Sequence, residues 1–407
     1  MSPQHYRDRN RMARVSEVFR VFLLLGLTSF GGPVAHLGYF RTELVDKRRW
    51  LSDAAYADLV ALCQFLPGPA SSQVGFGLGL MRAGWPGALA AWLAFTLPSA
   101  LALVLLATLA STAAGSLEAL LHGLKVVAVA IIAHAVLGMA RNLCPDRARA
   151  SMALLAAALV LLLGGLSGQL LAIMAGALAG AVWCRHLAIP AAVAPLFGVS
   201  RGAAVVALGV FVVLLAGLPW MATLTAQPGW QILDSFYRAG ALVFGGGHVV
   251  LPLLEAETVQ AGHIGADAFL AGYGATQAVP GPLFTFAGFL GAEWAAGLGA
   301  SGTMIWSLAG LALVAVFLPG LLLLIAVLPF WQWAGQWAGL RAVMAGANAA
   351  VVGILGAALY QPVFTSAIQS SAELVLALLC FVLLTAWKAP SWLVVLVGAG
   401  GGLLLGP

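Results

Sequence analysis

Charged residues are unusually scarce in this sequence. Asp, Glu, Lys and Arg together make up 8% of its 407 residues, whereas a soluble globular domain carries roughly 25%. Hydrophobic residues make up 62%, and the mean hydropathy is +1.00. This composition excludes a soluble domain and predicts an all-α protein that crosses a membrane several times and lies among lipids. Because no soluble surface carries the net charge of +5, we expect no nucleic acid as a partner.

Cysteine is also scarce, and the common catalytic motifs are missing. The four cysteines are scattered without a CxxC pair, so neither a metal site nor a disulfide framework is expected. No HExxH motif and no Walker motif occurs, and the only dense acidic set is Glu255 with Glu257. We therefore expect no enzyme, no catalytic residues, no cofactor, no metal and no ATP-driven transport by this chain.

Long apolar runs are what the sequence has in abundance. Clear examples are residues 87–114, 151–184, 202–220 and 304–328. A helix of about 20 apolar residues is long enough to cross a bilayer, so each run predicts at least one transmembrane helix.

Two motifs occur twice in the same order. QFLPGPASSQVGF at 64–76 matches QAVPGPLFTFAGF at 277–289, and SFGGPVAHLGYF at 29–40 matches VFGGGHVVLPLL at 243–254. The offsets are 213 and 214 residues, which indicates one duplicated unit rather than two chance matches.

Further landmarks follow at similar spacing. The offset of 214 places Glu43 on Glu257 and Asp53 on Asp267. TLPSALAL at 96–103 resembles FLPGLLLL at 317–324, and GLKVVAVA at 123–130 resembles GLRAVMAG at 339–346. The last match pairs Lys125 with Arg341, one basic residue in an apolar stretch of each half.

The repeat predicts how the chain is divided. A cytoplasmic tail over 1–14 precedes a first repeat over 15–187, and a linker over 188–230 leads into a second repeat over 231–407. The linker contains the apolar stretch 202–220, which has no counterpart in the repeat. We expect this stretch to be one additional transmembrane helix.

The distribution of basic residues predicts the topology. Of the 19 Lys and Arg residues, 16 lie at or before Arg201. The positive-inside rule places the basic loops at 41–49, at Arg82, at 141–149 and at 185–201 in the cytoplasm, together with the N-terminus. Loops 112–117 and 164–168 lack Lys and Arg, so they are expected outside.

This topology requires two hairpins in the first half. Segments 21–40 and 53–81 both begin and end beside cytoplasmic loops, so each should enter the membrane and return at its FGG or PGP motif. The extra helix over 202–220 then starts the second half on the opposite face, with a periplasmic C-terminus. The halves would be inverted-topology repeats with broken or re-entrant helices, a plan that recurs in secondary transporters.

The broken helices predict an anion site. A helix that starts after Pro-Gly-Pro presents free N–H groups and a partial positive charge. The substrate-binding candidates from the first half are Gly31, Gly32, Pro67, Gly68, Pro69, Ser71, Ser72 and Gln73. Those from the second half are Gly245, Gly246, Pro280, Gly281, Pro282 and Thr285. The alternative is that these prolines and glycines only bend the helices.

Charged and titratable residues near these motifs are further candidates. Lys125 and Arg341 are candidates for neutralising a bound dianion, unless they only extend toward a membrane surface. The candidates for a coupling proton are Glu43, Glu255, Glu257, His36 and His248. The alternatives are ion pairs with loop residues such as Arg48 for the glutamates and simple packing for the histidines. Asp53 and Asp267 are expected in the first turns of helices.

The paired motifs FGGP…QxxPGP and FGGG…QxxPGP resemble those of the chromate ion transporter (CHR) family, in its long two-domain form. The resemblance covers essentially the whole chain. It implies a proton-coupled exporter of chromate in the bacterial inner membrane that confers chromate resistance. Alternatives are a channel or uniporter, or another oxyanion such as sulfate, since chromate is a similar tetrahedral dianion. A homodimer among membrane lipids is the expected assembly.

Overall fold

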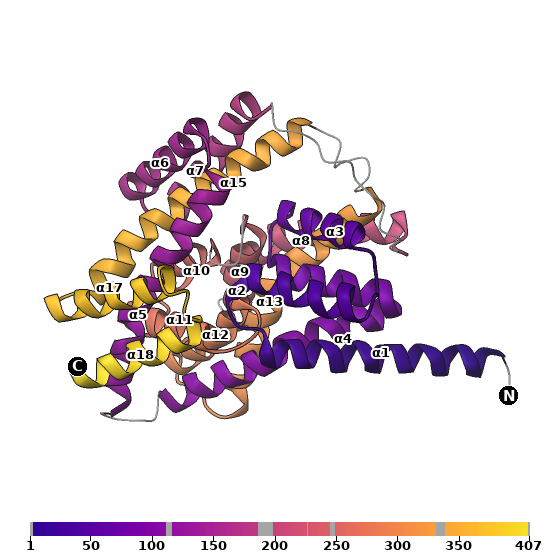
Figure 1. Ribbon diagram of the computed structural model, residues 1–407, viewed down its shortest axis with the longest axis horizontal. Coiled ribbons are helices and arrows are strands. Elements are labelled where there is room, and N and C mark those ends of the chain that lie inside the picture. The colour runs from indigo at the N-terminus through magenta and orange to yellow at the C-terminus, as the bar shows by residue number, and fades with distance from the viewer. Residues whose placement is uncertain are drawn as a thin grey trace.

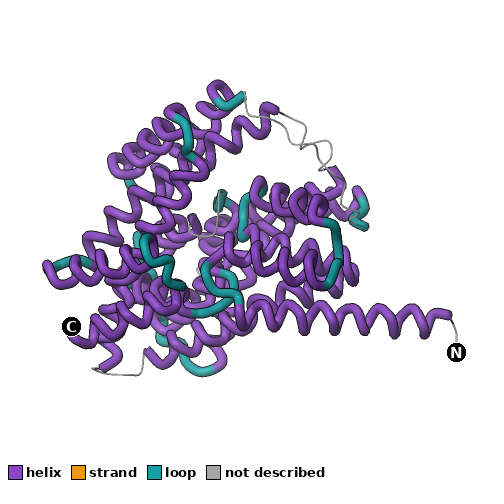
Figure 2. The backbone as a smooth tube through the Cα atoms, viewed as in Figure 1, coloured by secondary structure: helices purple, strands orange, loops and turns teal. Residues whose placement is uncertain are grey.

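The protein is built from helices. The computed structural model describes residues 3–110, 116–185, 198–225, 227–244, 249–330 and 338–405. Within these ranges the chain forms helices, turns and loops, and no strand is present (Figure 2). The expected all-α class is confirmed.

The first half begins with a helix that the FGG motif ends. Its helices are α1 (Pro3–Thr28), α2 (Gly32–Phe40), a π-helix (Arg41–Lys47), α3 (Asp53–Phe65), α4 (Ala70–Ala110), α5 (Ser116–Leu143), α6 (Arg147–Leu163) and α7 (Gly165–Trp183). Gly31 and Gly32 have φ angles of 99° and 76°, which only glycine adopts without strain. The Ser52 hydroxyl accepts a hydrogen bond from the Ala55 N–H and caps α3.

The turn expected at Arg82 lies within α4, between two helical segments. Ala83 has φ −140° and Gly84 has φ 69°, and a Cβ atom on Gly79 would clash with the carbonyl oxygen of Gly87. The two segments therefore fold back against each other at a tight turn. Pro86 follows directly, in the first turn of the second segment, where a missing N–H costs little.

The second half of the chain is also helical within the described residues. Its helices are α8 (Arg201–Thr225), α9 (Pro228–Ala241), α10 (Val250–Thr258), α11 (Ala266–Ala278), a 3₁₀ turn (Leu283–Thr285), α12 (Phe286–Gly297), α13 (Thr303–Val327), a 3₁₀ turn (Leu328–Phe330), α15 (Ala338–Ala358), a π-helix (Leu359–Phe364), α16 (Thr365–Ala367), α17 (Ser371–Thr385) and α18 (Ser391–Leu405). Helix α8 covers the apolar stretch of the linker.

The helices beside the repeated motifs have equal lengths in the two halves. Helices α2 and α10 have nine residues each, and α3 and α11 have 13 each. Asp53 and Asp267 both lie in the first turn of their helix, as expected.

Several helices are long and apolar enough to cross a membrane. Five such segments lie within the described residues, at 70–109, 122–143, 201–225, 303–330 and 341–367. On α4, the exposed leucines 89, 93, 97, 101, 105 and 109 recur every fourth residue. Such a stripe lies on one face of a helix, so this face of α4 is the one that meets lipid.

Helices from the two halves pack together in two outer groups. Helix α15 lies against α6 and α7, whereas α5 lies against α17 and α18 (Figure 1). A central group forms where α4 packs on α1 and α12, and α13 packs on α9 and α12. Each outer group therefore takes one helix from one half and two from the other, so neither half forms its group alone.

Candidate functional site

The first Pro-Gly-Pro turn separates α3 from α4 and contacts the second half. Gly68 has a φ of 113°, and a Cβ atom there would lie 2.8 Å from the Cα of Gly320. The Gly68 N–H donates a hydrogen bond of 2.7 Å to the Val243 carbonyl, just before the second FGG motif. Glycine is thus required both for the backbone angle and for the close approach.

The second Pro-Gly-Pro turn makes the corresponding contacts with the first half. Gly281 has a φ of 110°, and a Cβ atom there would lie 2.7 Å from the Ser99 Oγ. Its N–H donates a hydrogen bond of 3.0 Å to the Ser29 carbonyl, just before the first FGG motif. Ser29 matches Val243 under the repeat offset, so each turn bonds to the same landmark of the opposite half.

Helix α4 begins at Ala70, where the sequence places a helix start, and its first turn is buried and polar. Ser71, Ser72 and Gln73 are 2%, 2% and 0% exposed. The Gln73 Nε2 donates to the carbonyls of Pro67 (2.9 Å) and Gly320 (2.8 Å). Within the described residues, the Ser72 Oγ and the Gln73 Oε1 have no hydrogen-bond partner, which is uncommon for buried polar atoms.

The first half holds further buried polar groups, of which His36 lies beside this helix start. His36 is fully buried on α2, with its Nδ1 3.5 Å from the Ser71 Oγ and its ring edge-on to Phe95 at 5.3 Å. The hydroxyls of Ser29 and Thr96 are buried and have no partner in the described part of the chain. Sequence reasoning missed these two residues, although each belongs to a repeated landmark, SFGG or TLPS.

The second half offers fewer polar groups at its helix start. The Thr285 hydroxyl donates to the Pro282 carbonyl at 2.7 Å, so its donor is used within the turn. A 3₁₀ turn precedes α12, and Phe286 stands where the first half has Gln73. Of the other candidates, Gly245, Gly246 and His248 lie outside the described residues.

The sequence profile for chromate transporters matches residues 16–181 and 230–403, which together cover most of both halves. The chain belongs to the chromate transporter family. It is 30% identical to the chromate transport protein of Pseudomonas aeruginosa over 349 residues, which are 84% of this chain and 79% of that protein. It is 28% identical to the probable chromate transport protein of Synechococcus elongatus, over 96% of this chain and 95% of that one.

A third relative, the chromate transport protein of Cupriavidus metallidurans, is 28% identical over 93% of this chain and 90% of its own length. No solved structure matches the chain. The resemblance found from the repeated motifs is confirmed. Since the family comprises membrane transporters, the protein is a multi-pass transporter and not an enzyme.

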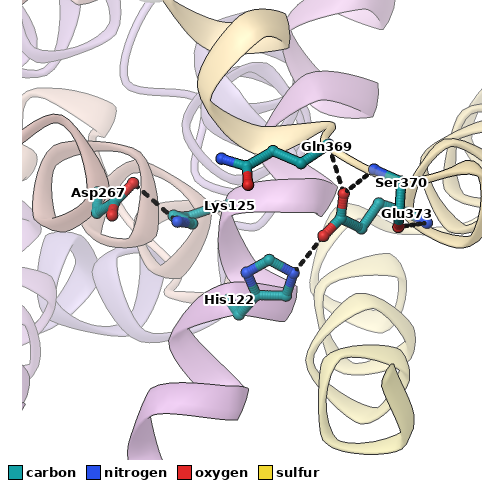
Figure 3. A network of polar contacts seen from close by, with 6 residues as sticks. All are labelled: His122, Lys125, Asp267, Gln369, Ser370 and Glu373. Atoms are coloured by element: carbon teal, nitrogen blue, oxygen red, sulfur yellow. Dashed lines mark hydrogen bonds and ion pairs between the residues drawn. The ribbon is translucent and has the colours of Figure 1, made fainter. Parts of the chain in front are cut away.

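The transporter's basic residues in apolar helices are engaged by protein groups. The Lys125 Nζ, on α5, lies 2.7 Å from the Asp267 Oδ1 at the start of α11 (Figure 3). One turn earlier on α5, the His122 Nε2 lies 2.8 Å from the Glu373 Oε1 of α17 (Figure 3). Arg341 lies in the first turn of α15 and is half-buried.

Two of the proposed proton carriers are held in ion pairs. Glu43 contacts Lys47 at 3.0 Å and Arg48 at 2.8 Å, which confirms the alternative of pairing with loop residues. Its hydrogen bond with Lys47 lowers the pKa of this carboxyl, against the opposing effect of burial. Glu257 is buried and accepts two hydrogen bonds of 2.7 Å from Arg238, and Asp234 contacts the same guanidinium at 3.0 Å.

A metal centre has no ligand set in the described ranges. No three His, Cys, Asp or Glu side chains come close enough there to hold an ion. Cys63, Cys184 and Cys380 are buried, and Cys144 is half-buried, all as free thiols.

Replacing the turn glycines tests how tightly the halves fit. Gly68→Ala forces a Cβ against the backbone of Gly320, so we expect the free energy of unfolding to fall by about 1–3 kcal/mol. Gly281→Ala brings its Cβ closest to the Ser99 hydroxyl, which can rotate away, so this variant should cost less. Gly138→Ala is the matched control, because nothing lies within 4 Å of its added Cβ. Equal effects of the three variants in detergent-solubilised unfolding would contradict the packing described.

Removing Arg238 tests the buried ion pair. Arg238→Ala leaves the Glu257 carboxylate buried without its partner, so we expect a loss of about 3–5 kcal/mol in unfolding free energy. Lys47→Ala removes one cation from the more exposed Glu43 cluster and should cost less than about 1 kcal/mol. The same unfolding assay measures both, and an Arg238→Ala protein as stable as Lys47→Ala would refute this ranking.

Proposed function

We propose that this protein exports chromate across the bacterial inner membrane by secondary active transport coupled to the proton gradient, and so confers chromate resistance. Family membership and three relatives named as chromate transport proteins support chromate as the substrate. The observation that carries the site assignment is the buried start of α4, where the Ser72 hydroxyl, a hydrogen-bond donor, has no partner in the described residues.

The chemistry of this helix start suits an oxyanion. The first N–H groups of a helix have no partner within it, and the helix dipole adds about half a positive charge there. Burial strengthens these interactions because no water competes. Ser71 and Ser72 add hydroxyl donors, and Gln73 holds the turn at Gly320 in place through its own amide. The first-half candidate site also includes Pro67, Gly68 and Pro69 of the turn before α4. Gly31 and Gly32 of the preceding FGG motif complete it.

The second half contributes the equivalent turn by the same reasoning. We place Pro280, Gly281, Pro282 and Thr285 on the other side of the substrate path, with Lys125 and Arg341 supplying positive charge. Equal lengths of α2 and α10 and of α3 and α11 support inverted repeats. Helix α8 adds one further crossing of the membrane. The second half then starts on the face opposite to the first, as inverted-topology repeats require. The uneven distribution of Lys and Arg supports a cytoplasmic N-terminus and a periplasmic C-terminus.

Proton coupling follows from the direction of transport. Export of a dianion from a negative-inside cell is favoured by the potential, but export against accumulated chromate outside needs a further driving force. Protons entering the cell supply one. Glu43 and Glu257 are held by basic partners, so Glu255 and His36 are the better candidates for carrying the proton.

Inside-out vesicles test substrate and coupling together. We expect uptake of radiolabelled chromate that responds to an imposed pH gradient at clamped voltage, with sulfate and molybdate as competitors. Uptake that ignores the pH gradient would instead indicate a channel or uniporter. Stronger transport of sulfate than of chromate would reassign the substrate.

Removing one hydroxyl tests the site itself. Ser72→Ala deletes a buried donor at the start of α4, so we expect the half-saturation concentration for chromate to rise about tenfold, the effect of one lost hydrogen bond to a charged group. Ser307→Ala is the matched control, because that hydroxyl is exposed and bonds only within its own helix. An unchanged half-saturation concentration in folded Ser72→Ala protein would remove this helix start from the site.

A further inference from the structure

A second polar site lies away from the Pro-Gly-Pro turns. A cavity of about 330 Å³ is enclosed by the α6–α7 turn, α10 and the end of α15 with its following π-helix. Its polar lining comes from Gln169, Glu255, Gln260 and Gln361. The loops beside it, 164–168 and 361–372, contain no Lys or Arg, which places the cavity toward the outer face under the proposed topology.

Glu255 is the one acidic side chain in this lining. It is 6% exposed, and its Oε2 accepts a hydrogen bond of 2.6 Å from the Gln260 Nε2. No basic side chain pairs with it among the described residues, in contrast to Glu257, two positions later, which holds Arg238. A buried carboxylate without a cation is costly to keep charged, so this position favours binding of a positive ion.

Gln169 gives a second, independent sign of a ligand. It is 2% exposed, and its Nε2 donates to the Pro252 carbonyl at 3.0 Å. Its Oε1 has no hydrogen-bond partner within the described part of the chain. When Glu255 is protonated, its carboxyl adds an O–H donor to the same cavity. The Gln169 Oε1 is an acceptor there that lacks a donor within the described residues.

We propose that Glu255, in the cavity lined by Gln169, Gln260 and Gln361, binds the proton that drives transport. This inference rests on the proposed function and selects one residue from its candidates. Glu255 takes up a proton from the outer side and releases it inward as the transporter changes conformation. Gln169 and Gln260 position the carboxyl and do not themselves titrate.

The charged groups around Glu255 do not oppose this role. Helix α10 packs on α7, α9 and α15. Helix α7 has no titratable side chain, and the Arg238 and Asp234 of α9 are engaged with Glu257 or each other. Arg341 lies in the first turn of α15, whereas the cavity lies at the last turn. His263, in the loop after α10, stacks on Trp294 at 3.7 Å.

Burial gives the carboxyl a suitable affinity for protons. Helix α10 lies outside the five segments long enough to cross the membrane. Burial raises the pKa of Glu255 to about 7, partly offset by the hydrogen bond from Gln260. A carboxyl that titrates near neutral pH can bind a proton at the more acidic outer side and release it at the less acidic cytoplasmic side.

Glu255→Gln tests the proposal in vesicles. We expect chromate uptake driven by a pH gradient to fall at least tenfold, to the rate without a gradient, while chromate–chromate exchange at equal pH is retained. Glu293→Gln is the matched control, since Glu293 is another partly buried glutamate but does not line the cavity. A pH-gradient response retained in Glu255→Gln overturns the proposal, and so does wild-type uptake that follows a sodium gradient instead.

Two readouts separate this proposal from the substrate assignment. Infrared difference spectra of wild type against Glu255→Gln should show a carboxyl band that titrates near neutral pH, whichever anion is carried. Gln260→Leu removes a donor to the charged form, so the midpoint of that titration should move to higher pH. Absence of a titrating band, or an unmoved midpoint, counts against Glu255 even if chromate transport is established.

A different observation, an asymmetry between the halves, carries a second inference. Helix α11 packs on α5 and α18, and the Lys125–Asp267 ion pair joins it to α5 (Figure 3). Its counterpart α3 packs on α4 and the preceding π-helix, and within the described residues it makes no comparable contact with α15 or α7. Asp53, which matches Asp267, pairs with Arg41 at 2.7 Å.

We infer that Lys125–Asp267 closes one face of the transporter and that Asp53 pairs with Arg341 when the opposite face closes. The repeat matches Lys125 with Arg341 and Asp267 with Asp53. If each half takes up the conformation that the other half has now, the ion pair Lys125–Asp267 is replaced by its counterpart, Arg341–Asp53. Because Asp267 is largely exposed, its ion pair contributes at most about 1 kcal/mol. Two states linked by such weak pairs stay close in energy, as alternating access requires.

Cross-linking with a bifunctional thiol reagent tests this exchange. We expect Lys125→Cys with Asp267→Cys to cross-link readily, and Asp53→Cys with Arg341→Cys to cross-link at least threefold more when Lys125 and Asp267 are both alanine. The four single-cysteine variants control for reaction with the native thiols. Failure of the second pair to cross-link in either background, or equal yields in both, overturns the inference. The result does not depend on which substrate the protein carries.

Discussion

The rest of the structure depends on how two interrupted helices satisfy their backbone groups inside a membrane. Lipid offers no hydrogen bonds, so an N–H freed by a helix break must find a partner in the protein. The Gly68 N–H finds the Val243 carbonyl, and the Gly281 N–H finds the Ser29 carbonyl. Each bond joins a turn of one half to the FGG landmark of the other. Each half therefore needs the other half to accept the hydrogen bond of its turn glycine.

That mutual dependence explains why glycine stands at the centre of both turns. The positive φ of Gly68 and the approach of Gly320 leave no room for a side chain. The start of α4 beside this turn is buried, and the Ser72 hydroxyl there is a donor without a partner within the described residues. A ligand with several acceptor oxygens is the kind of molecule that suits such a site.

The charged residues divide into structural and chemical groups. Arg238 binds both Glu257 and Asp234, and Lys125 binds Asp267, so these groups join helices. Glu255 differs because it lines a cavity and accepts a hydrogen bond only from Gln260 within the described chain. The proposed anion site at the start of α4 and the Glu255 cavity thus lie at separate places in the fold.

The sequence by itself determined the membrane class, the family, the helix breaks at FGG and PGP, the helix start at Ala70 and the acidic first turns of α3 and α11. These features depend on local composition, on proline and glycine geometry, and on motifs that need no packing to be recognised. It also anticipated the pairing of Glu43 with Arg48, because the two lie on neighbouring turns. The inverted repeat and the residues of the substrate site stay predictions, and Gly245, Gly246 and His248 lie outside the described residues.

Only the tertiary structure decided which distant groups meet. Lys125 and Asp267 are 142 residues apart, and no local pattern links them. Packing also brought Ser29 into contact with the second Pro-Gly-Pro turn, and placed Glu255 rather than Glu257 beside a cavity. The tight reversal at Gly84 likewise lets both segments of α4 pack along α1. Such contacts arise from the arrangement of whole helices, which side-chain type and spacing alone do not specify.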